Sequence, residues 1–151
     1  MKIHPKPDSR PVNEKTLDEL EGTVTGPPPY RSHVVTEVHR LRHVPLKRYR
    51  LEDLRLMIGQ GNGLPFLIPL ALEHLSEHPL AHGDFYPGDL LAAVARVPES
   101  FWKAHPHLLG QLTQALRGAV QRLKKIHTTP EAEAELLALL ASLERATGRD
   151  Q

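Results

Sequence analysis

Residues 107–127, HLLGQLTQALRGAVQRLKKIH, carry a hydrophobic pattern from which the fold class follows. Apolar residues recur in this stretch at intervals of three and four, which is the spacing of one face of an α-helix. They are Leu108, Leu109, Leu112, Ala115, Leu116, Ala119, Val120 and Leu123. The pattern predicts a long amphipathic helix from His107 to about His127.

The other apolar stretches have the same helical spacing, and proline and glycine stand between them where helices begin and end. Thr16 and Glu19 form a capping box at the first stretch, and Thr129 is the expected N-cap of the last. The predicted helices cover about residues 16–22, 32–43, 51–58, 65–78, 89–97, 98–102, 107–127 and 129–148. The sequence therefore predicts an all-α fold. We expect a single compact domain of about six to eight helices over residues 16–148, after a flexible, disordered tail over residues 1–15.

The composition excludes several classes of protein. There is no cysteine among the 151 residues, which excludes disulfides, thiolate nucleophiles and cysteine-ligated zinc, and favours a reducing, cytoplasmic location. The first 15 residues lack the apolar segment of a signal peptide, and no stretch has the roughly 20 apolar residues of a membrane helix, so we predict no membrane partner. The net charge of +1 gives no overall attraction to nucleic acid.

A possible metal site is the motif H-x-x-E-H formed by His74, Glu77 and His78. In this pattern two histidines one helical turn apart bind zinc while the glutamate activates a water, and His82 or Asp84 would complete the coordination. A proline follows the motif directly, so the helix ends at the second ligand, and no distant third ligand is evident. We therefore favour solvated residues at a helix end and predict no metal and no other cofactor. A zinc-dependent hydrolase is kept as an alternative.

Two further segments are candidate binding sites. Residues 39–50, HRLRHVPLKRYR, contain five Lys or Arg residues, which suits phosphates. Only Tyr49 could stack on a base, so we favour a solvated basic face or a site for an acidic protein and predict no nucleic acid, with a small nucleic-acid-binding protein as an alternative. Residues 59–63, GQGNG, could cradle a phosphate, but no strand precedes them, and we favour a turn between two helices.

The loop HGDFYPGD, residues 82–89, places two adjacent aromatic residues between acids. Phe85 and Tyr86 could be an exposed contact for a partner, because aromatic residues dominate interface energetics. Alternatively, both rings fill the core while Asp84 or Asp89 caps the next helix, and we favour this reading on ordinary burial preferences. Trp102 is expected in the core for the same reason.

Several stretches, in this order and spacing, resemble the bacterial contact-dependent growth inhibition (CDI) immunity proteins. They are LDELEG (17–22), PPY (28–30), HRLR (39–42), EDLRLMIGQGNGLP (52–65), PLALE (69–73) and GDFYPGDLL (83–91). The resemblance covers about residues 17–102, whereas the last two predicted helices are generic. One departure is Arg50, which stands where a helix-capping Thr or Ser is expected.

The resemblance implies a cytoplasmic protein, not an enzyme and without catalytic residues, that neutralises a toxin. Its partner would be the C-terminal toxin domain of a cognate CDI effector, often a nuclease, whose active site it would cover. A basic nuclease would be faced by acidic residues. We therefore expect toxin contacts in the loop and nearby, or on the last helix: Glu73, Glu77, Asp84, Phe85, Tyr86 and Asp89, or Glu131, Glu133 and Glu135.

Overall fold

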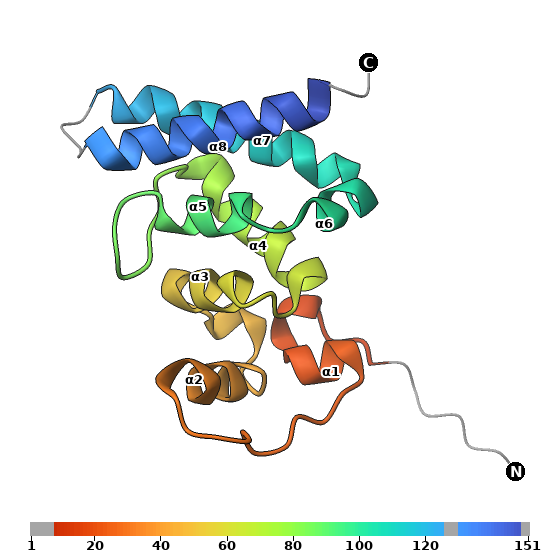
Figure 1. Cartoon of the computed structure of the whole chain (residues 1–151). Helices are drawn as coiled ribbons and strands as arrows, with labels where there is room; N and C mark the ends of the chain where they lie inside the picture. Colours follow the sequence, from red (N-terminus) through yellow and green to blue (C-terminus); the bar gives the residue numbers. More distant parts are fainter. Residues whose placement is uncertain (1–7, 126–129, 149–151) are drawn as a thin grey trace, which may run out of the picture. The chain divides into compact units, whose positions relative to one another are not determined.

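The computed structural model describes residues 8–125 and 130–148, and within these ranges every regular element is helical (Figure 1). The elements are η1 (Val12–Glu14), α1 (Leu17–Glu21), α2 (His33–Leu41), η2 (Leu46–Arg48), α3 (Leu51–Gly59), α4 (Leu64–Glu77), α5 (Asp89–Ala95), α6 (Glu99–Ala104), α7 (Pro106–Leu123) and α8 (Pro130–Gly148). The predicted all-α class is confirmed. The prediction that the helix of residues 107–127 extends to about His127 is wrong, because α7 ends at Leu123. Residues 1–7 of the predicted tail and the predicted cap Thr129 lie outside the described ranges.

The helices fall into two compact units, an N-terminal unit ending at Tyr49 and a C-terminal unit starting at Arg50. None of the helices in the described ranges has the length and hydrophobicity of a membrane span. The domain limits predicted from the sequence, a tail over 1–15 and a domain over 16–148, stay a prediction.

Two helices of the N-terminal unit begin at side-chain caps, and the sequence predicts the first of them. The Thr16 hydroxyl accepts from the Glu19 amide at 3.2 Å, and the Glu19 carboxylate accepts from the Thr16 amide at 3.3 Å, which completes the capping box of α1. At α2, the Ser32 hydroxyl accepts from the Val35 amide at 3.1 Å. The part of the predicted tail next to α1 is also structured, because the amide of Leu46 donates to the carbonyl of Lys15 at 3.0 Å.

The C-terminal unit is assembled around α7, which contacts α4, α5, α6 and α8, while α3 packs on α4 and α5. α7 and α8 lie side by side along one edge of this unit (Figure 1). The predicted apolar face of α7 is buried at Leu108, Leu112, Ala115, Leu116, Ala119, Val120 and Leu123, whereas Leu109 is half-buried. Burying a leucine side chain contributes roughly 2 kcal/mol, so this stripe is a main source of the unit's stability.

The glycine-rich stretch 59–63 is the turn between α3 and α4, as predicted. Gly59 is the last residue of α3, and Gly63 is the N-cap of α4. This turn places α3 against α4, and α3 also packs on α5. The N-terminal end of α3 and the loop between α4 and α5 therefore belong to the same packed unit.

Candidate functional site

The loop between α4 and α5 is held in place by the buried carboxylate of Asp89, which is 4% exposed. This carboxylate accepts from the amides of Gly83 at 2.7 Å, Phe85 at 3.0 Å and Tyr86 at 3.4 Å. The prediction that Asp84 or Asp89 caps α5 is therefore wrong. Gly88 is the N-cap, at a φ of 91°, and Asp89 is the first helical residue, whose side chain turns back to the loop.

A second carboxylate, Glu52 in the first turn of α3, holds the start of the loop. It accepts from the Asp84 amide at 2.7 Å and pairs with Arg55, whose Nε lies 2.9 Å from both carboxylate oxygens. The Arg55 guanidinium, with the Asp84 amide, holds the pKa of Glu52 below its ordinary value. A Cβ added at Gly83 would lie 2.9 Å from the Cα of Glu52, so the loop can approach α3 only with glycine at this position.

These contacts leave Phe85 outside the core. The residue is 68% exposed, and the prediction that its ring fills the core is wrong. The reason is that Asp89 and Glu52 bind the loop amides on the inner side, which directs the Phe85 side chain outward. One face of its ring lies against the guanidinium of Arg55, 4.3 Å from the ring centroid.

Tyr86 and Trp102, which were also predicted to lie in the core, are less exposed than Phe85. Tyr86 is half-buried rather than in the core, and its hydroxyl donates to the Glu135 carboxylate of α8 at 3.1 Å. Trp102 is 4% exposed and donates from its indole nitrogen to the Val97 carbonyl at 3.1 Å, so the prediction of a core tryptophan is confirmed.

A groove of about 630 Å³ opens beside the loop. Its walls include Arg55 from α3, Phe85 and Tyr86 from the loop, and Ala93 and Arg96 from α5 or its end. Arg96 forms an ion pair with Glu135 of α8. The loop, the groove and the start of α8 are thus one continuous surface, which we call the loop surface.

The residues expected to contact a toxin differ in their exposure. Asp84 and Glu131 are exposed, as are Glu73 and Glu77 on the C-terminal half of α4, whereas Glu133 and Glu135 are half-buried and Asp89 is buried. The structure brings Tyr86 and Glu135 together from positions 49 residues apart in the sequence. Arg55, Arg96 and Glu52 belong to the same surface but were not predicted, because their proximity depends on how α3, α5 and α8 pack.

Comparison with known protein families assigns most of the chain. The profile of the CDI immunity proteins matches residues 19–112, which run from α1 into α7 and include the whole loop. The chain belongs to the CDI immunity proteins. No match to a curated protein or to a solved structure was found.

In this immunity protein, the H-x-x-E-H motif lies at the exposed end of α4. His74 and Glu77 are in the last turn, and His78 is the first residue beyond the helix. Within residues 8–125 and 130–148, no three His, Asp or Glu side chains are placed to hold a metal ion. His74, Glu77 and His78 are all exposed, which places the motif at a solvated helix end.

The basic segment 39–50 is largely engaged in ion pairs. Arg40 pairs with Glu37 at 2.8 Å, and Arg50 pairs with Asp53 at 3.3 Å. The amide of Arg50 also donates to the Asp53 carboxylate at 2.9 Å, which explains how α3 begins at Leu51 without a Ser or Thr cap. These pairs compensate part of the segment's positive charge locally.

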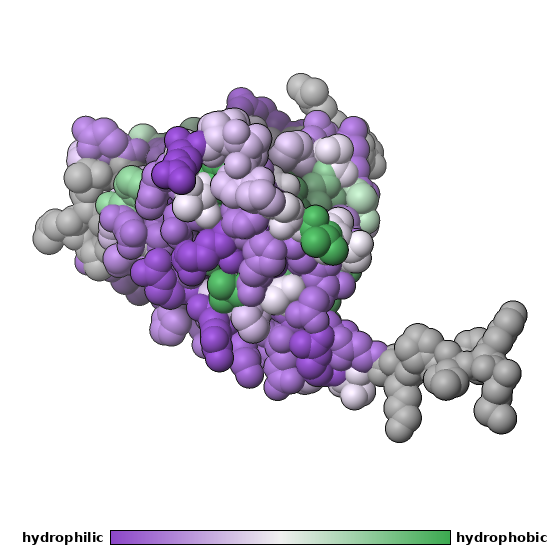
Figure 2. Space-filling view, turned by 90° about the horizontal axis from the view of Figure 1, so that it is seen from below, coloured by the Kyte–Doolittle hydropathy of each residue, from purple (hydrophilic) through white to green (hydrophobic). Residues whose placement is uncertain are grey.

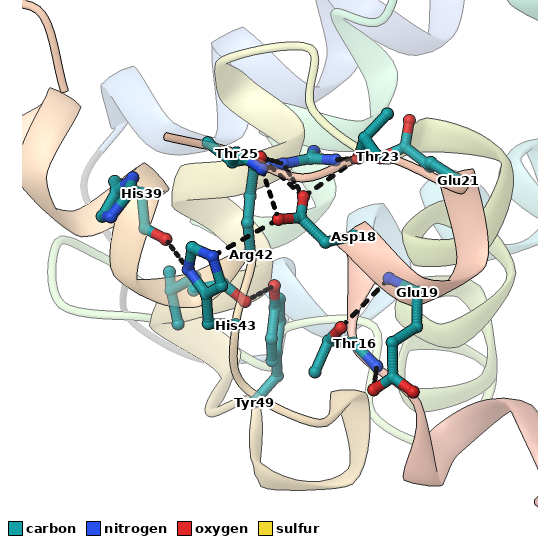
Figure 3. A network of polar contacts seen from close by, with 11 residues as sticks. Thr16, Asp18, Glu19, Glu21, Thr23, Thr25, His39, Arg42, His43 and Tyr49 are labelled. Carbon is teal, nitrogen blue, oxygen red and sulfur yellow. Dashed lines mark hydrogen bonds and ion pairs between the residues drawn. The ribbon is translucent and has the colours of Figure 1, made fainter. Parts of the chain in front are cut away.

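Arg42, in the same segment, is the centre of a polar network in the N-terminal unit (Figure 3). Its Nε donates to Asp18 and Thr25, both at 2.8 Å, and its Nη2 donates to Glu21 at 2.8 Å and Thr23 at 3.0 Å. Thr23 and Thr25 donate their hydroxyls to Asp18 in turn. The network fixes the segment after α1 and holds Val24 on the outside, 96% exposed.

The protonation of Asp18 couples this network to pH. Burial alone would raise the pKa of Asp18, but hydrogen bonds from Thr25, Thr23 and Arg42 outweigh it and hold the pKa well below its ordinary value. Because the pKa of Asp18 is lower in the folded state than in the unfolded state, its ionisation stabilises the fold at pH values above the unfolded-state pKa of about 3.9. This stabilisation is lost as the pH falls from there towards the folded-state pKa.

We therefore expect Asp18→Asn to flatten the acid dependence of stability. The deficit of the variant relative to the wild type should be largest near pH 7 and shrink below about pH 4. Urea unfolding at pH 7, 5 and 3, followed by circular dichroism, measures this. A deficit of equal size at all three pH values would show that the charge of Asp18 contributes nothing.

Proposed function

We propose that this immunity protein binds the C-terminal toxin domain of a cognate CDI effector in the cytoplasm and blocks it by covering the active site. We further propose that the toxin is a nuclease. The observation that carries the proposal is membership of the CDI immunity family over residues 19–112. Inhibition by steric cover requires a stable, preformed surface and no catalytic residue.

The loop surface supports this proposal through its charge and its rigidity. A nuclease presents cations around its active site because it binds phosphates, so an inhibitor that covers the site should be acidic. Asp84 and Glu131 are exposed acids of the loop surface, and Asp89 and Glu52 hold the loop backbone in advance. Figure 2 shows one face of the molecule, on which hydrophilic residues predominate.

Co-expression with the toxin domain encoded beside the gene tests the proposal. We expect that cells producing both proteins survive and that the two copurify, whereas cells producing the toxin domain alone die. Purified toxin should cleave nucleic acid, and stoichiometric immunity protein should abolish the cleavage. Killing despite folded immunity protein, without a complex, would refute the cognate pairing. Survival without any nuclease activity would refute only the nuclease assignment.

Reversal of exposed acids should locate the toxin contact. Asp84→Lys or Glu131→Lys should slow association about three- to tenfold at low salt, with a smaller effect at high salt, because rim charges act mainly on the association rate. Glu73→Lys with Glu77→Lys tests whether the contact extends along α4. Glu99→Lys, an exposed acid of α6, is the control. Unchanged association in all the test variants would place the contact elsewhere.

A further inference from the structure

We infer that Phe85 seats a lysine or arginine side chain of the toxin on the open face of its ring, beside the carboxylate of Asp84. The inference rests on the proposed function and specifies the chemistry of the contact. Its starting point is an aromatic ring that is 68% exposed although it belongs to a loop fixed by buried carboxylates. Aromatic side chains are enriched in protein interfaces, and one that a fixed backbone presents to solvent suits a contact surface.

The loop backbone is organised before any partner arrives. Four of its amide contacts, from residues 83–86, end on the carboxylates of Asp89 and Glu52. Gly83 lies against the backbone of α3, and a Cβ at Gly88 would lie 3.3 Å from Leu136 of α8, so both ends of the loop are closely packed. Binding through Phe85 therefore costs little ordering entropy, which is the condition for a single residue to contribute much affinity.

The charge around the ring favours a cation. Three carboxylates, Glu52, Asp84 and Asp89, act on the one guanidinium of Arg55, so the loop has an excess of negative charge. On α8, Glu135 balances Arg96, and the exposed Glu131 precedes it by one helical turn. A second cation on the open face of Phe85 would not be repelled strongly by Arg55, because Glu52 already neutralises it.

An acidic segment of the toxin is the competing occupant, because Arg55 and Arg96 both line the groove. Both arginines are already paired, with Glu52 and Glu135, so most of their charge is compensated, and an incoming carboxylate would also be repelled by these two acids. A cation is attracted by the same acids, and it gains the ring and the exposed carboxylate of Asp84.

Affinities of full-length Phe85 variants for the purified toxin domain test the inference. Phe85→Ala should weaken binding about 30-fold, Phe85→Leu about fivefold, and Phe85→Tyr less than about twofold, because only the aromatic variant keeps the ring face. Tyr30→Ala, which removes another exposed aromatic residue, should leave the affinity unchanged. The lysines and arginines of the toxin should also be replaced by alanine one at a time, and the affinity measured with the wild type and with Phe85→Ala. For one of them, the loss of affinity should be at least fivefold smaller with Phe85→Ala than with the wild type.

The outcomes separate the two proposals. Toxin binding by the wild type with no effect of Phe85→Ala would overturn the inference and leave the proposed function intact. Equal affinity of Phe85→Leu and the wild type would refute a cation as the occupant. The same holds if a double-mutant cycle couples the groove residues to an acidic residue of the toxin instead of a basic one. No binding by the wild type would refute the proposed function and the inference with it.

Discussion

Arg42→Ala should lower the free energy of unfolding by about 3–5 kcal/mol, because it leaves the buried carboxylate of Asp18 without its cation. Asp18 is 7% exposed, and Arg42 donates to it, to Glu21 and to two threonine hydroxyls. After the substitution, Asp18 keeps only hydroxyl, amide and histidine partners, so the cost of removing its charge from water is offset less completely. Urea unfolding followed by circular dichroism measures the loss.

A matched control is the ion pair of Arg40 and Glu37, which lies on the surface of the same unit. The Arg40 side chain is 49% exposed, so Arg40→Ala should cost less than about 1 kcal/mol. Adding Asp18→Asn to Arg42→Ala should recover part of the loss, because the uncompensated charge is then absent. Equal stability of Arg40→Ala and Arg42→Ala would contradict a stabilising role for the network.

The helices could be predicted from the sequence because their signals are local. The capping box of Thr16 and Glu19 spans four residues, and the apolar stripe of α7 repeats within single turns. Rules of spacing and capping act at this range, so most predicted helix ends agree with the structure to within one or two residues.

The polar contacts of the two units could not be predicted, because they join residues far apart in the sequence. Asp18 and Arg42 are separated by 24 residues, and the basic segment around Arg42 gave no sign that one of its arginines is buried. Likewise, the position of Phe85 depends on Glu52 of α3, whose carboxylate accepts from the amide of the preceding residue, Asp84. Average burial preferences place phenylalanine inside, but they do not include the backbone contacts that direct this side chain outward.

Asp89→Ala should lower the free energy of unfolding by about 3 kcal/mol, because it removes the acceptor of three loop amides at a site that is 4% exposed. Asp89→Asn should cost less, since its single carbonyl oxygen can still accept from part of the set. Asp84→Ala, which removes the neighbouring exposed carboxylate, should change stability by less than about 0.5 kcal/mol and is the matched control. Thermal and urea unfolding compare the three variants.

The same substitution decides whether the loop is a contact surface or only part of the scaffold. Without the Asp89 carboxylate, the loop that carries Phe85 is no longer held in one conformation. If Phe85 binds the toxin, part of the binding free energy is then used to order this loop, and the toxin should dissociate faster. The affinity of Asp89→Ala for the toxin domain should be measured at a temperature where circular dichroism shows the variant to be fully folded. Reduced stability with unchanged affinity would assign Asp89 and its loop to the scaffold, whereas loss of both would connect the buried carboxylate to toxin binding through the position of Phe85.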